Sequence, residues 1–141
     1  MNKYNLPLDE LTDIALDEDG NFRIGTDGDL LIIKGVQVVI QDIKNELVTS
    51  LNNLFYDSSY GGNLIKFISK PNDEINRIEL IQNVEEIVRR NEMVEPESVN
   101  CDVVTWDLKK ISISITFVIN DQKQTLVAEV GDNINVKVIS S

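Results

Sequence analysis

The chain has 141 residues, of which 42% are hydrophobic and 26% charged, as is typical of a soluble globular protein that can build one domain around a core. Its net charge of −11, from 13 basic and 24 acidic side chains, disfavours nucleic acid and anionic membranes as partners, because both are themselves negative. We expect a basic or neutral protein surface as partner, although the charge can also serve only to keep the chain soluble. The chain has no histidine, which removes the commonest general base and zinc ligand, so no cofactor or metal site is predicted.

Several features indicate synthesis and assembly in the cytoplasm. Cys101 is the single cysteine, so no intrachain disulfide can form, and a lone thiol suits a reducing compartment. No stretch approaches the roughly 20 apolar residues of a membrane span, and the N-terminus lacks the apolar core of a signal peptide. Residues 1–12 show no sustained hydrophobic period and are expected to form a flexible arm.

Short strands with tight turns follow this arm. Apolar residues at 14–16, at 22 and 24, and at 30–33 are separated by Asp19-Gly20 and Asp27-Gly28, and aspartate followed by glycine is a strong turn signal. The pattern predicts a short N-terminal hairpin.

A long amphipathic helix is predicted to start after Gly35. Its apolar residues recur at intervals of three and four: Val36, Val39, Ile40, Ile43, Leu47, Leu51 and Leu54. The pattern stops before Tyr60-Gly61-Gly62, where paired glycines indicate a sharp turn. A short apolar helix or turn over 64–68 is expected next, ending near Pro71.

A second amphipathic helix is predicted from about residue 73. Asn72 or Asp73 can cap its N-terminus, and Arg89 and Arg90 suit its negative C-terminal end. Pro96 is expected to end the helical geometry. The predicted apolar stripe consists of Ile75, Ile78, Leu80 or Ile81, Val84, Ile87 and Val88.

The last third of the chain alternates with a period of two, which indicates β-strands. Strands joined by such short turns must be antiparallel, since a parallel pair needs a long crossover. The predicted fold class is therefore α+β, an antiparallel β meander packed against two amphipathic helices with a short N-terminal hairpin, in a single domain over residues 1–141. The expected inward-facing residues include Val99, Cys101, Val103, Ile111, Ile113, Ile115, Phe117, Ile119, Leu126, Ala128, Val130, Ile134, Val136 and Val138.

The order of these motifs resembles the wedge and sheath-initiator family of contractile phage tails and related injection machines. A leading glycine, a helix of the form Q-x-I-x-x-x-L-x-T and a later Y-G-x-x-L carry the resemblance, at Gly35, Gln41, Ile43, Leu47, Thr49, Tyr60, Gly61 and Leu64. The run DEDGNFRIGTDGDLLIIKG resembles the leading hairpin of the same family. The resemblance implies a structural baseplate component of a phage tail, a bacteriocin or another contractile injection system, assembled in the bacterial cytoplasm and then part of the particle. It also implies the larger wedge subunits and the tail sheath protein as partners, and sixfold copies in the particle.

Two other functions remain open from the sequence. The family has at times carried a lysozyme-like label, so a carboxylate-dependent peptidoglycan hydrolase is one alternative. A small soluble adaptor unrelated to phage is the other. No catalytic residue is assigned, because the chain has no nucleophile elbow, P-loop or cysteine-histidine pair.

Three stretches are candidate partner-binding residues. Tyr60, Gly61 and Gly62 are expected to shape the turn after the first helix. Glu95 and Pro96 match the start of an E-P-R motif often seen in the family, whereas Glu97 reverses the charge of its third residue. Pro96 can equally be no more than a helix stop. Trp106 is expected to pack in the core rather than to bind a partner.

The C-terminal strand is the third candidate, comprising Ile134, Asn135, Val136, Lys137, Val138 and Ile139. The meander ends there, so the strand should lie at a sheet edge with N–H and C=O groups open to strand addition by the sheath. Asn135 and Lys137 are expected to point outward, and proline at either should remove a ladder donor. Val136 and Val138 are expected to tie the strand to the core.

Overall fold

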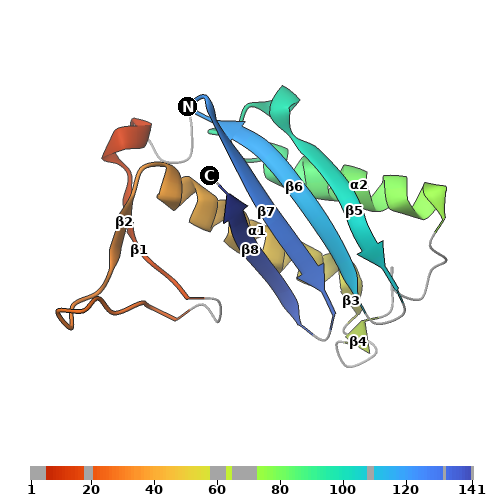
Figure 1. Ribbon diagram of the computed structural model, residues 1–141, viewed down its shortest axis with the longest axis horizontal. Coiled ribbons are helices and arrows are strands. Elements are labelled where there is room, and N and C mark those ends of the chain that lie inside the picture. Colours follow the sequence, from red (N-terminus) through yellow and green to blue (C-terminus); the bar gives the residue numbers. More distant parts are fainter. Residues whose placement is uncertain are drawn as a thin grey trace.

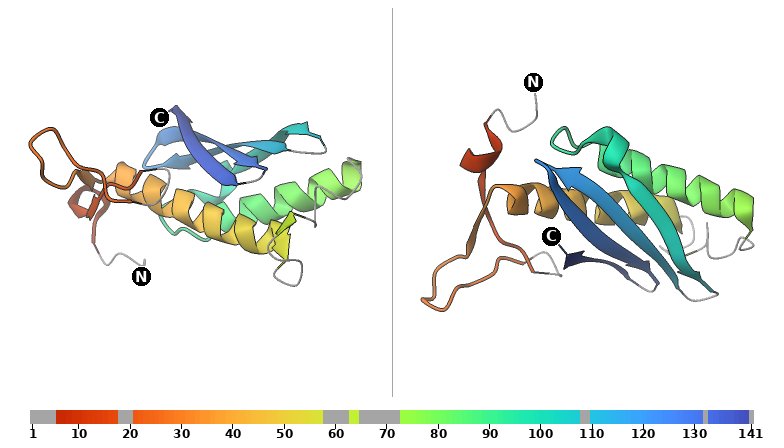
Figure 2. Two further views of the ribbon diagram at one scale, coloured as in Figure 1. Left: turned by 90° about the horizontal axis from the view of Figure 1, so that it is seen from below. Right: turned by 45° about the horizontal axis from the view of Figure 1, so that its top comes forward.

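The protein is built from two layers, a four-stranded antiparallel sheet and a pair of helices that cover one of its faces (Figure 1; Figure 2, left). The computed structural model describes residues 6–17, 21–57, 63–64, 73–107, 110–131 and 133–140. The strands β5 (Asn100–Trp106), β6 (Ile111–Ile119), β7 (Gln122–Val130) and β8 (Ile134–Ser140) lie side by side in chain order. The predicted α+β fold with a helix-covered meander is thus confirmed.

The first helix, α1 (Val36–Phe55), begins at the predicted position. Leu47 and Leu51 have no exposed surface, Ile43 is almost fully buried, and the remaining stripe residues are buried or half-buried. Leu47 shares the core with Ile115 of β6, which is also fully buried. The three-and-four spacing of apolar residues therefore places one face of α1 against the sheet.

The second helix, α2 (Glu74–Arg89), is capped by Asp73, whose side chain accepts a hydrogen bond from the N–H of Asn76. Its buried residues are Leu80, Val84, Ile87 and Val88. The predicted stripe is wrong in the first turns, because Ile75 and Ile78 are exposed. The helix also ends at Arg89, well before Pro96, which instead opens a short 3-10 helix, Pro96–Ser98. Among the described residues, no helix is long and apolar enough to cross a membrane.

The central strand β6 carries the densest part of the core. All five of its odd-numbered residues are buried beneath the helices, as the period of two predicts: Ile111, Ile113, Ile115, Phe117 and Ile119. The β6–β7 turn places Asn120 and Asp121 at φ values of 50° and 62°. Positive φ at both central residues is characteristic of a type I′ hairpin, so this turn fixes the register of the two strands.

A β-bulge in β5 decides the position of Trp106. Val103 pairs with Ile113 but Thr105 pairs with Ser112, so Val104 is an extra residue with no opposite partner. Val104 is exposed, whereas Trp106 is only 9% exposed and joins the core. Strict alternation would have turned Trp106 to the same face as Val104. The bulge therefore produces the expected core packing of the tryptophan.

The N-terminal hairpin projects beyond the sheet at the first turns of α1 (Figure 2). Strands β1 (Thr12–Ile14) and β2 (Ile32–Lys34) pair at its base, as the sequence predicts. Within the segment expected to form a flexible arm, a short 3-10 helix spans Leu8–Glu10 and Leu11 is buried at 4% exposure. The carbonyl of Leu11 accepts the N–H of Gly35, whose φ of +60° lets the chain turn from β2 into α1.

A short pairing closes the segment after α1. Strand β3 (Tyr56–Asp57) is antiparallel to β4 (Asn63–Leu64), so the chain reverses direction between them. Leu64 lies in a strand instead of the expected short helix or turn. The expected turn at Tyr60, Gly61 and Gly62, and the apolar stretch that follows Leu64, lie outside the described residues.

Candidate partner-binding site

The two edges of the sheet differ, and the hydrogen bonds at β6 show how. The N–H of Val118 donates to the Ser98 hydroxyl, and the carbonyl of Val118 accepts the N–H of Glu95. The backbone of even-numbered β6 residues therefore faces the β5 side. Because backbone groups alternate along an antiparallel strand, the odd-numbered residues bond to β7, in agreement with the type I′ turn that joins Ile119 to Gln122.

The β5 edge is closed by α2. By the same alternation, the N–H of Cys101 points outward from the β5 edge. The Glu85 carboxylate on α2 accepts this N–H, with 3.3 Å between nitrogen and oxygen. The bulge at Val104 distorts this edge further. Both features are ways in which natural sheets prevent pairing with another chain.

The β8 edge is open among the described residues. Val127 pairs with Lys137 and Glu129 with Asn135, and the alternation makes these the hydrogen-bonded pairs. The N–H and C=O groups of Ile134, Val136 and Val138 consequently point away from the sheet. The side chains of Asn135 and Lys137 face outward, but their backbone N–H and C=O groups bond to β7. Proline at either position would therefore remove a hydrogen bond to β7 and leave the open edge unchanged.

The side chains of β8 divide along its length. Val136 is 3% exposed and ties the strand to the core as expected. Val138 is 43% exposed, so its predicted role in the core is wrong, and Ile139 is 60% exposed. A shift in register between Thr125 and Leu126 leaves Ile139 without an opposite partner. The end of β8 thus presents apolar side chains to solvent next to its open backbone.

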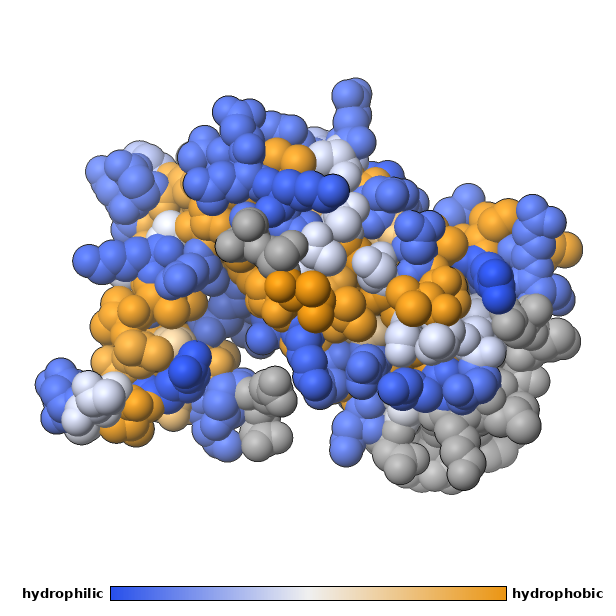
Figure 3. Space-filling view, in the orientation of Figure 1, coloured by the Kyte–Doolittle hydropathy of each residue, from blue (hydrophilic) through white to orange (hydrophobic). Residues whose placement is uncertain are grey.

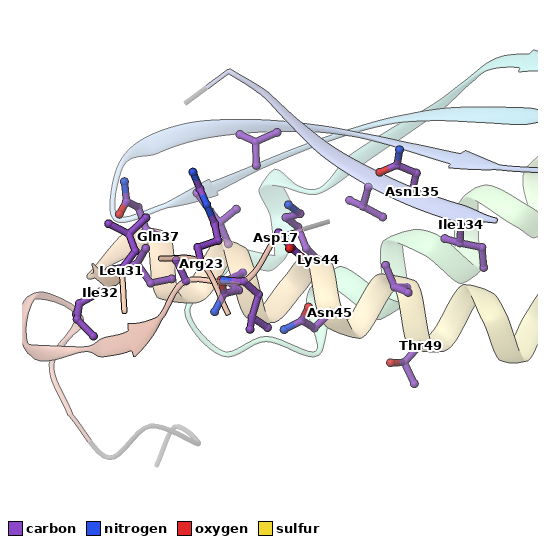
Figure 4. A pocket seen from close by; sticks show the side chains of 18 residues that line it. Asp17, Arg23, Leu31, Ile32, Gln37, Lys44, Asn45, Thr49, Ile134 and Asn135 are labelled. Atoms are coloured by element: carbon purple, nitrogen blue, oxygen red, sulfur yellow. The ribbon is translucent and has the colours of Figure 1, made fainter. Parts of the chain in front are cut away.

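A cleft of about 810 Å³ lies beside this edge, between β8, α1 and the N-terminal hairpin (Figure 4). Ile134, Val136 and Val138 form its β8 wall. Ile40 and Val48 are apolar lining residues from α1. Polar groups from the other two walls are Asp17, Arg23, Gln37, Gln41, Lys44, Asn45 and Thr49. An apolar cleft with a few polar groups along a free strand edge can hold an extended peptide segment.

Gln41 fixes the hairpin wall of the cleft to α1. Its side-chain carbonyl accepts the N–H of Leu16 at 2.8 Å, and its amide NH₂ donates to the carbonyl of Ile14 at 3.0 Å. The side chain thus satisfies one donor and one acceptor on the edge of the hairpin, as a neighbouring strand would. These two hydrogen bonds join the hairpin wall of the cleft to α1.

The structure does not bring the other candidate residues to this cleft. Glu95 and Pro96 are exposed and lie beside the end of β6, so β7 separates them from β8. The Arg89 guanidinium donates to the Pro96 carbonyl at 3.0 Å and holds this connection in place. Tyr60, Gly61 and Gly62 lie outside the described residues, so the positions of these candidates relative to β8 are not assigned.

Reactive side chains are scarce in the described part of the chain. Burial and, to a smaller extent, the nearby Glu85 carboxylate raise the pKa of the Cys101 thiol to about 12. A thiol with such a pKa remains protonated near neutral pH and is a poor nucleophile. The described residues contain no group of three or more cysteine or carboxylate side chains placed to hold a metal ion.

The family model for the contractile injection system sheath initiator matches residues 12–124. This match spans the hairpin, both helices, β5, β6 and the start of β7. The chain belongs to this family. Comparisons with curated proteins and with solved structures found no match.

Membership makes this sheath initiator a component of a contractile injection particle that interacts with sheath and baseplate. It removes the alternative of an adaptor unrelated to such particles. The family is structural, which is consistent with the expectation of a non-enzyme. β8 follows the matched residues, so the family match does not by itself describe the open edge.

Two functional residues have roles that the sequence interpretation missed. From the sequence, Gln41 is identified only as a residue of the family motif. A polar residue within a motif of apolar positions was the available signal. Glu85 gave no signal, because an acidic residue on an amphipathic helix is ordinarily solvated.

Proposed function

We propose that this sheath initiator joins the larger wedge subunits to the first sheath ring, and that a sheath segment adds as a strand to β8. The supporting observation is that the N–H and C=O groups of Ile134, Val136 and Val138 point out of the sheet beside an apolar cleft. The closure of the β5 edge by Glu85 supports the same assignment, because it leaves β8 as the edge suited to strand addition.

The chemistry of the cleft indicates what kind of segment would fit. A strand added beside β8 exchanges backbone hydrogen bonds, and every second side chain turns toward α1. There it meets Ile40 and Val48, so we propose a segment with alternating apolar residues. The polar side of such a segment would face solvent next to Asn135 and Lys137.

Glu95 and Pro96 offer a second surface, which we propose for the wedge subunits. The two residues are exposed, and the Arg89 hydrogen bond to the Pro96 carbonyl stabilises the conformation of the segment. The separation of this surface from β8 would let one chain contact wedge and sheath together. Sixfold copies in the particle are part of the proposal.

Proline at Val138 tests the strand addition. Val138→Pro removes an outward N–H while the Lys137 and Asn135 hydrogen bonds to β7 remain, and proline is tolerated on edge strands where the N–H faces solvent. Val138→Ala is the matched control, because it shortens the same side chain and keeps the N–H. Both purified variants should show the circular dichroism of the parent.

Particles assembled with each variant would then be counted by electron microscopy. We expect Val138→Pro to reduce the fraction of sheathed tails sharply and Val138→Ala to leave it close to the parent. Normal sheath assembly on folded Val138→Pro would rule out β8 as the docking edge.

A further inference from the structure

The N-terminal hairpin has one apolar face that nothing in the described part of the chain covers. Residues directly opposite each other on antiparallel strands point to the same side, and so do alternate residues along one strand. The pairs are Ile14 with Ile32, Leu16 with Phe22, and Ile24 with Leu30. These six residues therefore share one side of the hairpin, here called the outer hairpin face.

The outer hairpin face is largely in contact with solvent. Phe22 and Ile24 are each 61% exposed, Ile32 is 52% and Leu30 is 43% exposed. Figure 3 shows the corresponding apolar surface gathered over the hairpin, at the left of the molecule. A contiguous apolar patch of this kind is uncommon on a monomeric protein and marks an interaction site.

The opposite side of the hairpin already has a structural role. Ala15 is 3% exposed, Ile33 packs against the core, and Arg23 and Leu31 line the cleft beside β8. Leu16 and Ile32 of the outer hairpin face also line the cleft, whereas Phe22, Ile24 and Leu30 do not. A partner centred on these three residues would therefore leave the cleft free, and the two surfaces adjoin at Leu16 and Ile32.

The charge of the hairpin indicates the chemistry of the partner. In the sequence, residues 12–34 carry six carboxylates against the two cations Arg23 and Lys34, a net charge of −4. Asp27 and Asp29 are exposed at the tip of the hairpin. A second copy of this chain, which has a net charge of −11, would be repelled electrostatically.

We infer that the outer hairpin face binds an apolar surface of another protein of the particle, and that lysine or arginine side chains flank this surface. The exposed side chains of Phe22, Ile24 and Leu30 supply the contact area, and the carboxylates at the tip orient the basic partner. The contact is independent of the strand addition proposed for β8.

Photo-crosslinking in assembled particles tests this inference. The photoreactive residue benzoylphenylalanine would replace Phe22 on the outer face or, as the matched control, Arg23 on the opposite face one position away. We expect the Phe22 position to give a crosslink to one other protein, at apolar residues next to lysine or arginine, that the Arg23 position does not give. A crosslink to a second copy of this chain, or equal products at both positions, would overturn the inference.

Substitutions at Asp29 test the contribution of charge. Asp29→Lys should lower the yield of the Phe22 crosslink by about fivefold, the change in equilibrium that corresponds to roughly 1 kcal/mol for an exposed ion pair. Asp29→Asn should have a smaller effect. An unchanged yield with Asp29→Lys would exclude a basic partner.

Incorporation into particles gives a second measurement. Ile24→Ser removes an exposed apolar side chain from the outer hairpin face, whereas Ile75→Ser makes the same change at a 77% exposed position on α2. We expect only Ile24→Ser, folded by circular dichroism, to reduce the amount of this chain in purified particles. Equal incorporation of both variants would contradict a role for the outer hairpin face, whatever the result at Val138.

Discussion

Gln41 and Leu16 are joined by a 2.8 Å hydrogen bond between the helix side chain and the hairpin backbone, although 25 residues separate them in sequence. Together with the 3.0 Å bond from the same amide to Ile14, it sets the position of the hairpin against α1. A single side chain on α1 thus positions one wall of the cleft beside β8.

Loss of this amide should loosen the hairpin without unfolding the sheet. Gln41→Leu removes two hydrogen bonds, which typically contribute roughly 0.5–1.5 kcal/mol each. We expect faster hydrogen exchange at the Leu16 amide and at other hairpin amides, with little change in β6. Asn45→Leu, one helical turn further along α1, is the control. Equal exchange at Leu16 in both variants would show that the Gln41 contact does not hold the hairpin.

Gln124 is a candidate for stabilisation by substitution. It is fully buried opposite Phe117, and within the described part of the chain neither polar atom of its side-chain amide has a hydrogen-bond partner. An unsatisfied buried polar group costs roughly 1–3 kcal/mol. Gln124→Leu should therefore raise the free energy of unfolding by about that amount in urea titrations, whereas Gln122→Leu at an exposed position should not. A destabilised Gln124→Leu variant would imply that the amide has a partner in solution.

The contact between helix and sheet should dominate stability. Leu47 and Ile115 are both fully buried in it. Replacing either with alanine should lower the free energy of unfolding by roughly 2–5 kcal/mol, through lost transfer energy and a cavity. Val48→Ala, at a 38% exposed position on α1, should cost much less. If the Leu47→Ala, Ile115→Ala and Val48→Ala variants unfolded at the same urea concentration, the layer arrangement would be contradicted.

The thiol of Cys101 should react slowly until the protein unfolds. Its pKa is raised from 9.0 to about 12 by burial and by Glu85, so the thiolate fraction at pH 8 falls by roughly a thousandfold. We expect slow modification by a disulfide reagent in buffer and rapid modification in denaturing urea. Rapid modification of the native protein would show that the β5 edge opens readily.

The same pKa shift predicts a dependence of stability on pH. Between about pH 9 and 12 the unfolded thiol loses its proton while the folded thiol keeps it, so stability falls as pH rises. The fall is at most about 1.4 kcal/mol per pH unit, and the contribution is fully present below pH 9. Cys101→Val should show a shallower decline over this range. Parallel curves for the two proteins would exclude a buried, protonated thiol.

The sequence predicts buried faces best where one hydrophobic periodicity continues over several helical turns or several pairs of strand residues. The apolar stripe of α1 and the alternation in β6 are regular enough to identify the buried face of each element correctly. Leu47 on α1 and Ile115 on β6 are examples. The same reasoning fails for Ile75 and Ile78, which continue the period of α2 but are exposed. Burial requires an opposing surface, and periodicity cannot show where that surface ends.

The sequence by itself determined the α+β class, the strand order of a meander with short turns, and the family. Local spacing and turn chemistry are sufficient for these, since Asn120-Asp121 and the apolar patterns act through near neighbours. Only the tertiary structure decided which backbone groups of β8 face outward, that Glu85 closes the β5 edge, and that Gln41 holds the hairpin. Each of these depends on contacts between segments distant in sequence, and side-chain polarity carries no information about backbone direction at an edge.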